Sequence, residues 1–109
     1  MNQNRSFLTG TLSTIVLALL KDNGEMYGYE ICQKTRELTN EGIQLTEGAI
    51  YPTLHKLEKN GLIISKKMKV NGRTRKYYLI NVSSKVEVDQ QIHLLSRFTI
   101  HLKAILNPA

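Results

Sequence analysis

Residues 56–76 read KLEKNGLIISKKMKVNGRTRK, and this stretch decides the fold that the sequence predicts. It contains eight of the fifteen lysines and arginines of the chain but a single acid, Glu58. Its first residues continue a helical pattern that stops at Gly61. From Leu62 onward the pattern has a period of two, and Asn71-Gly72 is typical of a two-residue hairpin turn. A helix followed by a basic β-hairpin is an arrangement typical of DNA-binding proteins.

The turn at Asn71-Gly72 determines the register that we expect of the hairpin. A type I′ turn pairs Val70 with Arg73, Met68 with Arg75, Lys67 with Lys76, Lys66 with Tyr77 and Ile64 with Leu79. Like charges directly opposite one another destabilise a sheet by up to about 1 kcal/mol. We therefore expect an anion, such as a phosphate, between Lys67 and Lys76. A basic hairpin edge that merely prevents strand-to-strand aggregation remains an alternative.

The helix before the hairpin carries the surface that we expect to enter a DNA groove. Thr46 is a good N-cap, and Ile50, Leu54 and Leu57 mark one inward face. The opposite face is small at its start, which allows close approach, and basic at its end, which reaches flanking phosphates. Its residues are Gly48, Pro52, His55 and Lys59, flanked by Ala49 and Lys56. Because proline removes a backbone hydrogen bond inside a helix, a helix that begins only near Tyr51 is an alternative.

Apolar spacing predicts further helices at residues 11–22, 27–39 and 84–106. The last helix would extend about 35 Å. Its apolar stripe consists of Val88, Ile92, Leu95, Phe98, Leu102 and Ile105. A small body of three helices and a hairpin cannot cover so long a stripe, so we expect much of it to pack on a second copy of the chain; burial within one chain is the alternative.

Composition limits the class of protein. With 109 residues and a net charge of +6, the chain has the size of one domain and favours an anionic partner. Its one cysteine, Cys32, allows no internal disulfide and is expected to be an inert thiol, as in a cytoplasmic protein. The longest apolar run, residues 15–20, is too short to span a bilayer, so no membrane association is expected.

The sequence predicts no catalytic or metal site. His55, His93 and His101 are the only histidines, and together with Cys32 they lack the spacing of a zinc site. The acids are scattered, without a pair in an apolar pocket, and there is no glycine-rich phosphate loop. We therefore expect neither an enzyme nor a bound cofactor or metal.

Four short motifs follow one another between Leu8 and Ile80. They are Tyr27-Gly28-Tyr29-Glu30-Ile31, Gly48-Ala49-Ile50-Tyr51-Pro52-Thr53-Leu54, Leu57-Glu58 followed by Gly61-Leu62-Ile63, and Gly72-Arg73 followed by Arg75-Lys76-Tyr77-Tyr78-Leu79. Their order and spacing resemble the PadR family of prokaryotic transcriptional regulators. The resemblance implies an α+β, mainly α fold: a winged helix-turn-helix domain at residues 1–82 and a C-terminal dimerisation helix at residues 83–109. It also implies a homodimer, often a repressor that a small effector releases from DNA.

Carried over by position, the resemblance implies two sets of DNA contacts. The set on the third helix, which enters the major groove, is Gly48, Ala49, Tyr51, Pro52, Thr53 and Lys56. The set on the hairpin, or wing, is Lys67, Lys69, Arg73, Arg75 and Lys76. The single short C-terminal helix resembles the compact branch of the family. The chain departs from the family pattern after Ile80, where Asn81-Val82-Ser83-Ser84 replaces the usual threonine-and-glycine turn.

Together these observations favour a sequence-specific regulator that binds double-stranded DNA as a homodimer. We expect a repressor that a small effector relieves, located in the prokaryotic cytoplasm and at the nucleoid when bound. Two alternatives remain open. The first is a protein-interaction module whose basic hairpin tip contacts an acidic partner. The second is an RNA-binding winged helix, although few exposed aromatic residues are available to stack unpaired bases.

Overall fold

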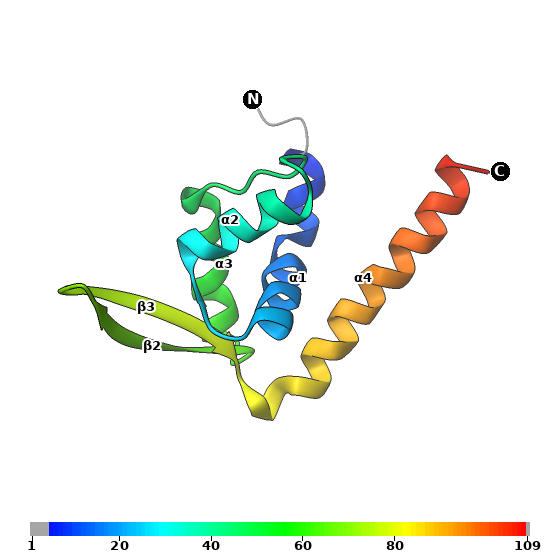
Figure 1. Cartoon of the computed structure of the whole chain (residues 1–109). Coiled ribbons are helices and arrows are strands. Elements are labelled where there is room, and N and C mark those ends of the chain that lie inside the picture. The colour runs from blue at the N-terminus through cyan, green and yellow to red at the C-terminus, as the bar shows by residue number, and fades with distance from the viewer. Residues whose placement is uncertain (1–4, 109) are drawn as a thin grey trace.

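The computed structural model describes residues 5–108, which form a helical body with a small sheet at its edge (Figure 1). The elements are α1 (Arg5–Asn23), β1 (Met26–Tyr27), α2 (Gly28–Leu38), α3 (Glu47–Lys59), β2 (Ile63–Val70), β3 (Arg73–Ile80), the 3-10 turn η1 (Val82–Ser84) and α4 (Lys85–Leu106). In Figure 1, α1 occupies the centre, α2 and α3 lie on one side of it, and α4 lies on the other. The hairpin of β2 and β3 projects from the body below α3. This is a winged helix with a long C-terminal helix.

The hairpin forms in the register that its turn predicts. β2 and β3 are antiparallel, and each predicted pair is confirmed, including Lys67 with Lys76. Asn71 and Gly72 have φ values of 52° and 79°. Both central positions of a type I′ turn need such positive values, and glycine adopts them without steric strain. The local turn chemistry therefore determines which residues face each other along the wing.

A third strand, β1, was not predicted. It pairs antiparallel with β3, so the strand order is β1-β3-β2. Two residues are too few for an alternating pattern, and Tyr27 was expected to begin the second helix, which in fact begins one residue later. Paired residues share a face of the sheet. Met26 therefore lies on the buried side with Tyr78, and Tyr27 lies on the opposite side with Tyr77.

Two helix starts differ in how well the sequence predicted them. α3 begins directly after Thr46, and the backbone nitrogen of Ala49 donates to the Thr46 hydroxyl at 3.2 Å. Pro52 lies inside this helix, so the alternative start near Tyr51 is wrong. α1 begins at Arg5, six residues before its expected start at residue 11.

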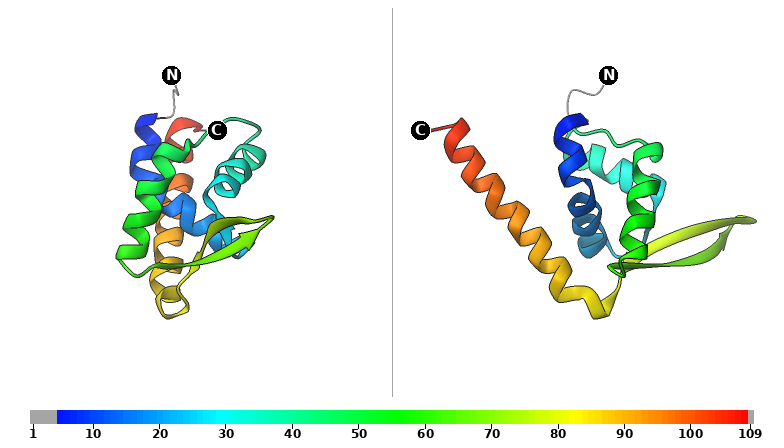
Figure 2. Two further views of the ribbon diagram at one scale, coloured as in Figure 1. Left: turned by 90° about the vertical axis from the view of Figure 1, so that its left-hand side faces the viewer. Right: turned by 180° about the vertical axis from the view of Figure 1, so that it is seen from behind.

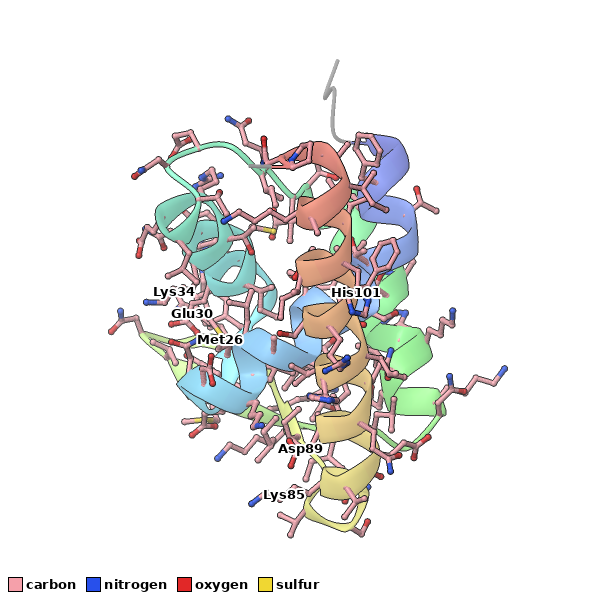
Figure 3. All side chains as sticks on the ribbon, turned by 90° about the vertical axis from the view of Figure 1, so that its right-hand side faces the viewer. Met26, Glu30, Lys34, Lys85, Asp89 and His101 are labelled. Carbon is pink, nitrogen blue, oxygen red and sulfur yellow. The ribbon has the colours of Figure 1, made fainter. Side chains whose placement is uncertain are left out.

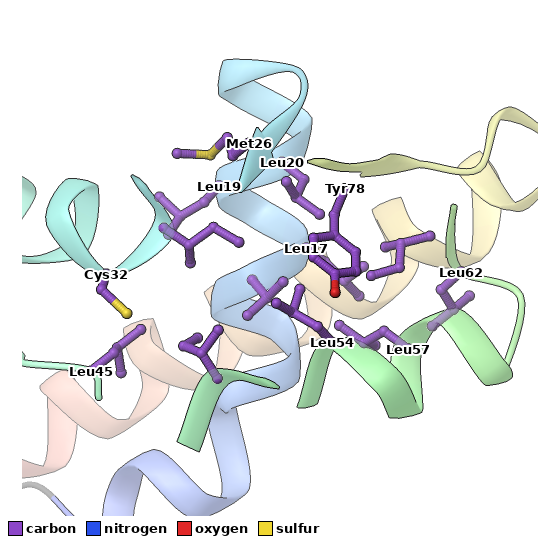
Figure 4. Packing of buried hydrophobic residues seen from close by; sticks show 14 of the residues in the cluster. Leu17, Leu19, Leu20, Met26, Cys32, Leu45, Leu54, Leu57, Leu62 and Tyr78 are labelled. Carbon is purple, nitrogen blue, oxygen red and sulfur yellow. The ribbon is translucent and has the colours of Figure 1, made fainter. Parts of the chain in front are cut away.

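The core packs both α3 and the wing onto α1 (Figure 4). Leu17 of α1 is fully buried, and so are Ile31 of α2 and Leu54 of α3. Tyr78 of β3 points its ring into the same cluster. Burial of each such side chain contributes about 1.5–3 kcal/mol. The elements that carry the basic residues are therefore attached to a single core.

α4 starts against this core and then leans away from α1 (Figure 2). Val88 in its first turns is 1% exposed and belongs to the chain's own core. The expectation that Val88 packs on a second copy is therefore wrong, because its own chain already covers it. Gln91 Nε2 donates to Thr14 Oγ1 at 3.3 Å, and Lys21 Nζ lies 2.7 Å from Asp89 Oδ1.

Residues 81–84, which depart from the family pattern, connect the end of α3 to the start of α4 through hydrogen bonds. Asn81 Nδ2 and Ser84 Oγ donate to the backbone oxygen of Gly61, at 2.9 Å and 2.8 Å. Gly61 directly follows the last turn of α3, so these two bonds hold the start of α4 beside the end of α3.

Candidate nucleic-acid interface

The predicted outward face of α3 is exposed. Its residues, which we call the reading face, are Gly48, Ala49, Pro52, His55, Lys56 and Lys59. The first half of this face is small and apolar, and the second half carries the cations. Thr53, which the resemblance also implied, is half-buried, and its hydroxyl donates to the backbone oxygen of Ala49 at 3.2 Å.

Tyr51 lies between the reading face and α2. Its side chain is 39% exposed, and its hydroxyl donates to Glu47 Oε1 at 3.5 Å. A Cβ added at Gly28 would lie 2.8 Å from Tyr51 Oη, so the tyrosine ring occupies the space that a larger residue at position 28 would need. Burial raises the pKa of Tyr51, and the neighbouring Glu47 carboxylate raises it further. Tyr51 therefore joins α3 to α2 and can meet a ligand only with part of its ring.

The five predicted wing cations do not share one face of the hairpin. Because paired residues lie on the same face, the register places Lys67, Lys69 and Lys76 on the side of Ser65 and the buried Tyr78. Arg73 and Arg75 lie on the other side with Tyr77.

The Arg75 side of the wing is packed against β1 and its neighbours. The Arg75 guanidinium lies 4.6 Å from the centre of the Tyr27 ring, which meets the Tyr77 ring edge-on at 5.3 Å. Lys66 Nζ lies 2.8 Å from Glu25 Oε2. A cation over an aromatic ring is attracted to the ring face. These contacts brace the base of the wing, and they depend on the strand that the sequence did not predict.

The other side of the wing is bonded to the last turn of α3. Ser65 Oγ donates to Glu58 Oε2 at 2.5 Å, and Lys76 Nζ lies 3.5 Å from Glu58 Oε1. The Ser65 hydrogen bond lowers the pKa of Glu58, and the charge of Lys76 lowers it further against the opposing effect of burial. Lys76 therefore already has a carboxylate partner within the chain. Of the two lysines that were expected to bind an anion together, only Lys67 has no acidic partner among the described residues.

The remaining cations of this surface have no acidic partner. Within residues 5–108, no acid lies in ion-pair distance of Lys56, Lys59, Lys67, Lys69 or Arg73. They are all exposed and lie at the end of α3 and in the outer part of the wing. The region can therefore attract an extended anion such as a nucleic-acid backbone.

Residues 16–90 match the family described as transcriptional regulator PadR-like. The chain belongs to this family. Over 74 residues it is 36% identical to a transcriptional regulator of Mycobacterium tuberculosis, in a match that covers 68% of this chain and 65% of that protein. The chain thus spans just under two thirds of the length of that curated relative.

Two solved structures are similar to most of the chain. A transcriptional regulator from Clostridium thermocellum superposes with a TM-score of 0.76 at 30% identity, over 94% of this chain and 96% of that one. Bacillus subtilis PadR in complex with operator DNA superposes with a TM-score of 0.65 at 28% identity, over 73% of this chain and 45% of that one. The resemblance inferred from the four motifs is confirmed.

In this PadR-like chain, α4 exposes more apolar surface than the predicted stripe. Phe98 is 57% exposed, and Leu102 and Ile105 are exposed with it, whereas Ile92 packs against the core. Exposed apolar residues of α4 that the predicted stripe did not include are Val86, Leu94, Ile100 and Leu106. Val86 and Ile100 lie on another side of the helix, whereas Leu106 follows Leu102 at a spacing of four and continues the stripe.

A cavity of about 490 Å³ lies where α4 joins the winged helix. Its apolar lining comes from Leu20, Leu79, Ile80, Val82 and Val88, and its charged lining from Lys21, Glu25, Lys85 and Asp89. Figure 3 shows Lys85 and Asp89 at the base of α4, where that helix begins. The volume lies in the range of small-molecule sites, and the cavity borders both the helix that leans outward and the sheet that carries the wing.

Neither a metal site nor a reactive thiol is found among residues 5–108. No group of three potential metal ligands comes together there. Cys32 is buried, and burial raises its pKa, which disfavours the reactive thiolate. No helix in this part of the chain is long and apolar enough to cross a bilayer.

Proposed function

We propose that this PadR-like chain is a sequence-specific regulator that binds operator DNA as a homodimer and represses transcription. The observation that carries the proposal is the joint surface of the reading face and the outer wing, where five exposed cations have no acidic partner among residues 5–108. The relative from Bacillus subtilis binds operator DNA, which supports the same partner for this chain.

The two parts of this surface have different tasks. Gly48, Ala49 and Pro52 present little bulk, so the start of α3 can approach base edges closely. Lys56 and Lys59 then reach the flanking phosphates, and Lys67, Lys69 and Arg73 hold the backbone beside the wing. Sequence choice thus depends on α3, and the wing contributes affinity for any duplex.

The homodimer forms through the outer part of α4. An exposed helix face that carries Phe98, Leu102 and Ile105 is unfavourable in water, and a second copy would remove that apolar surface. A two-fold dimer places two α3 helices on successive turns of the same face of DNA, about 34–36 Å apart. A dimer bound across a promoter prevents polymerase from using the same DNA, which is the simplest form of repression.

A small effector would act at the cavity beside the base of α4. This site lies between the DNA-binding elements and the dimerisation helix, so a bound molecule changes the angle at which α4 leaves the body. A change in that angle alters the separation of the two α3 helices and weakens operator binding.

Selection of duplexes from a random pool, followed by footprinting, tests the proposal. We expect a sequence motif with two-fold symmetry and protection of two half-sites about one helical turn apart. Selection with Ala49→Ser, at the exposed start of α3, should alter the motif, while the matched control Ala104→Ser, exposed near the end of α4, should not. A protected site without two-fold symmetry would contradict the dimer.

Two other outcomes would support the alternatives. A protein-interaction module would show little affinity for random duplex even at low salt, where phosphate contacts are strongest. An RNA-binding winged helix would bind single-stranded RNA in preference to duplex DNA in a competition assay.

A further inference from the structure

We propose that Glu58 is a positioning residue that joins the wing to α3 and keeps Lys76 in an internal ion pair, so that Lys76 does not contact phosphate in the DNA complex. The inference rests on the proposed DNA binding. It gives Lys76 a different role from the one that the family resemblance implies.

One carboxylate connects α3 with both strands of the wing. Glu58 lies in the last turn of α3, and its two oxygens have partners on different strands. Oε2 accepts the hydroxyl of Ser65 on β2 at 2.5 Å, and Oε1 lies 3.5 Å from Nζ of Lys76 on β3. Glu58 and these two partners, the Glu58 cluster, therefore determine the angle between the recognition helix and the wing.

Lys76 is held from a second side as well. Its Nζ lies 5.5 Å from the ring centre of Tyr78, which is fully buried in the core. The ammonium is thus placed between a carboxylate and the face of an immobile aromatic ring, and both contacts are favourable to a cation. Lys67, on the same face of the hairpin, has no such partner among the described residues. Of the two facing lysines, Lys76 is therefore neutralised by Glu58, whereas Lys67 has no acidic partner among the described residues.

Neither the helix nor DNA binding alone would favour an acid at position 58. The C-terminal end of a helix carries partial negative charge and prefers cations. A carboxylate close to phosphates would also repel them. Lys76 offsets both effects, since the pair has no net charge. With the charges balanced, the remaining effect of Glu58 is geometric, because its two contacts orient β2 and β3 relative to α3.

The salt dependence of DNA binding should show whether Lys76 contacts a phosphate. Each cation that neutralises a phosphate contributes about 0.9 to the slope of log affinity against log salt. In the native chain Lys76 should contribute nothing to this slope. Glu58→Gln should free Lys76 for one additional contact, so the slope should become steeper by about one.

Fluorescence anisotropy with a random-sequence duplex, over a series of salt concentrations, measures these slopes. Lys76→Gln should leave the slope unchanged in the native background and should remove the added slope in the Glu58→Gln background. Glu87→Gln is the control, because it removes one negative charge from an exposed position in the first turn of α4, away from α3 and the wing. In addition, the affinity ratio between a selected duplex and the random duplex should fall with Glu58→Gln but not with Glu87→Gln. A native slope that flattens by about one with Lys76→Gln, or equal slopes for the two glutamate variants, would overturn the inference.

Unfolding without DNA separates this inference from the proposed function. If the native chain binds no duplex at any salt concentration, the proposed function fails, but the Glu58 cluster can still be measured in thermal unfolding. Glu58→Gln and Lys76→Gln should then lower the melting temperature by less together than the sum of their separate effects, because they remove the same pair. Additive effects would show that Glu58 and Lys76 are not energetically coupled, which would contradict the inference.

Discussion

Replacement of Gly28 by alanine should destabilise the fold through a steric clash with the Tyr51 ring. The new Cβ would lie 2.8 Å from Tyr51 Oη and 2.9 Å from Cζ, well inside the optimal separation of about 3.5–4.0 Å. Overpacking of this kind costs about 1–3 kcal/mol, and alanine returns at most about 1 kcal/mol of helix propensity relative to glycine. The net loss is therefore about 1 kcal/mol. For a domain of this size it corresponds to a melting temperature lower by about 4–8 °C.

Thermal unfolding followed by circular dichroism measures the effect. Gly10→Ala is the matched control, since its Cβ would meet nothing within 4 Å, so it should stabilise α1 by up to about 1 kcal/mol. In a Tyr51→Ala background the ring is absent, and Gly28→Ala should then be neutral or slightly stabilising. The reasoning fails if Gly28→Ala is as stable as Gly10→Ala, or if the loss persists without the tyrosine ring.

Three further predictions concern the DNA surface, the dimer and the Glu58 cluster. Arg73→Gln should weaken binding to selected and random duplexes alike and lower the salt slope by about one, whereas Arg75→Gln should change the slope less because its guanidinium is held on an aromatic ring. Phe98→Glu should convert the dimer to monomer in light scattering, and His93→Glu, on the opposite side of α4, should leave it intact; a dimer with both variants would exclude this interface. The lowered pKa of Glu58 means that its contribution to stability is present above the ordinary glutamate value of about 4.3 and is lost as pH falls through the folded value. The melting-temperature difference between native chain and Glu58→Gln should therefore shrink on acidification, and a constant difference would contradict this origin.

Local chemistry made the hairpin and α3 predictable. Asn71-Gly72 defines a turn that only one register can follow, so the pairing of Lys67 with Lys76 could be stated from the sequence. Thr46 and the inward apolar residues likewise determine where α3 begins and which side faces outward. These features depend on neighbours within a few positions in the chain.

Tertiary contacts determine the features that the sequence could not reveal. β1 exists because β3 offers a free edge beside it, and two residues carry no periodic pattern of their own. The partner of Lys76 was missed because Glu58 is eighteen residues away in the chain. One observation could have indicated it: a lone acid at the end of a basic helix is unfavourable unless it has a cationic partner.

The proposed DNA surface combines three local features that would each be unfavourable in an isolated chain. Pro52 cannot donate to the backbone oxygen of Gly48, Glu58 lies at the negative end of α3, and Lys67 faces Lys76. A sequence optimised only for stability would avoid all three, and natural proteins tolerate such features chiefly at functional sites. The core, which holds Leu54 and Tyr78 fully buried, is strong enough to impose them. All three lie on α3 and the adjoining wing, the two elements of the proposed DNA surface. The Glu58–Lys76 pair offsets two of them within the chain. The exposed cations that remain would gain binding energy from an anionic partner, and the small residues at the start of α3 would let the helix approach it.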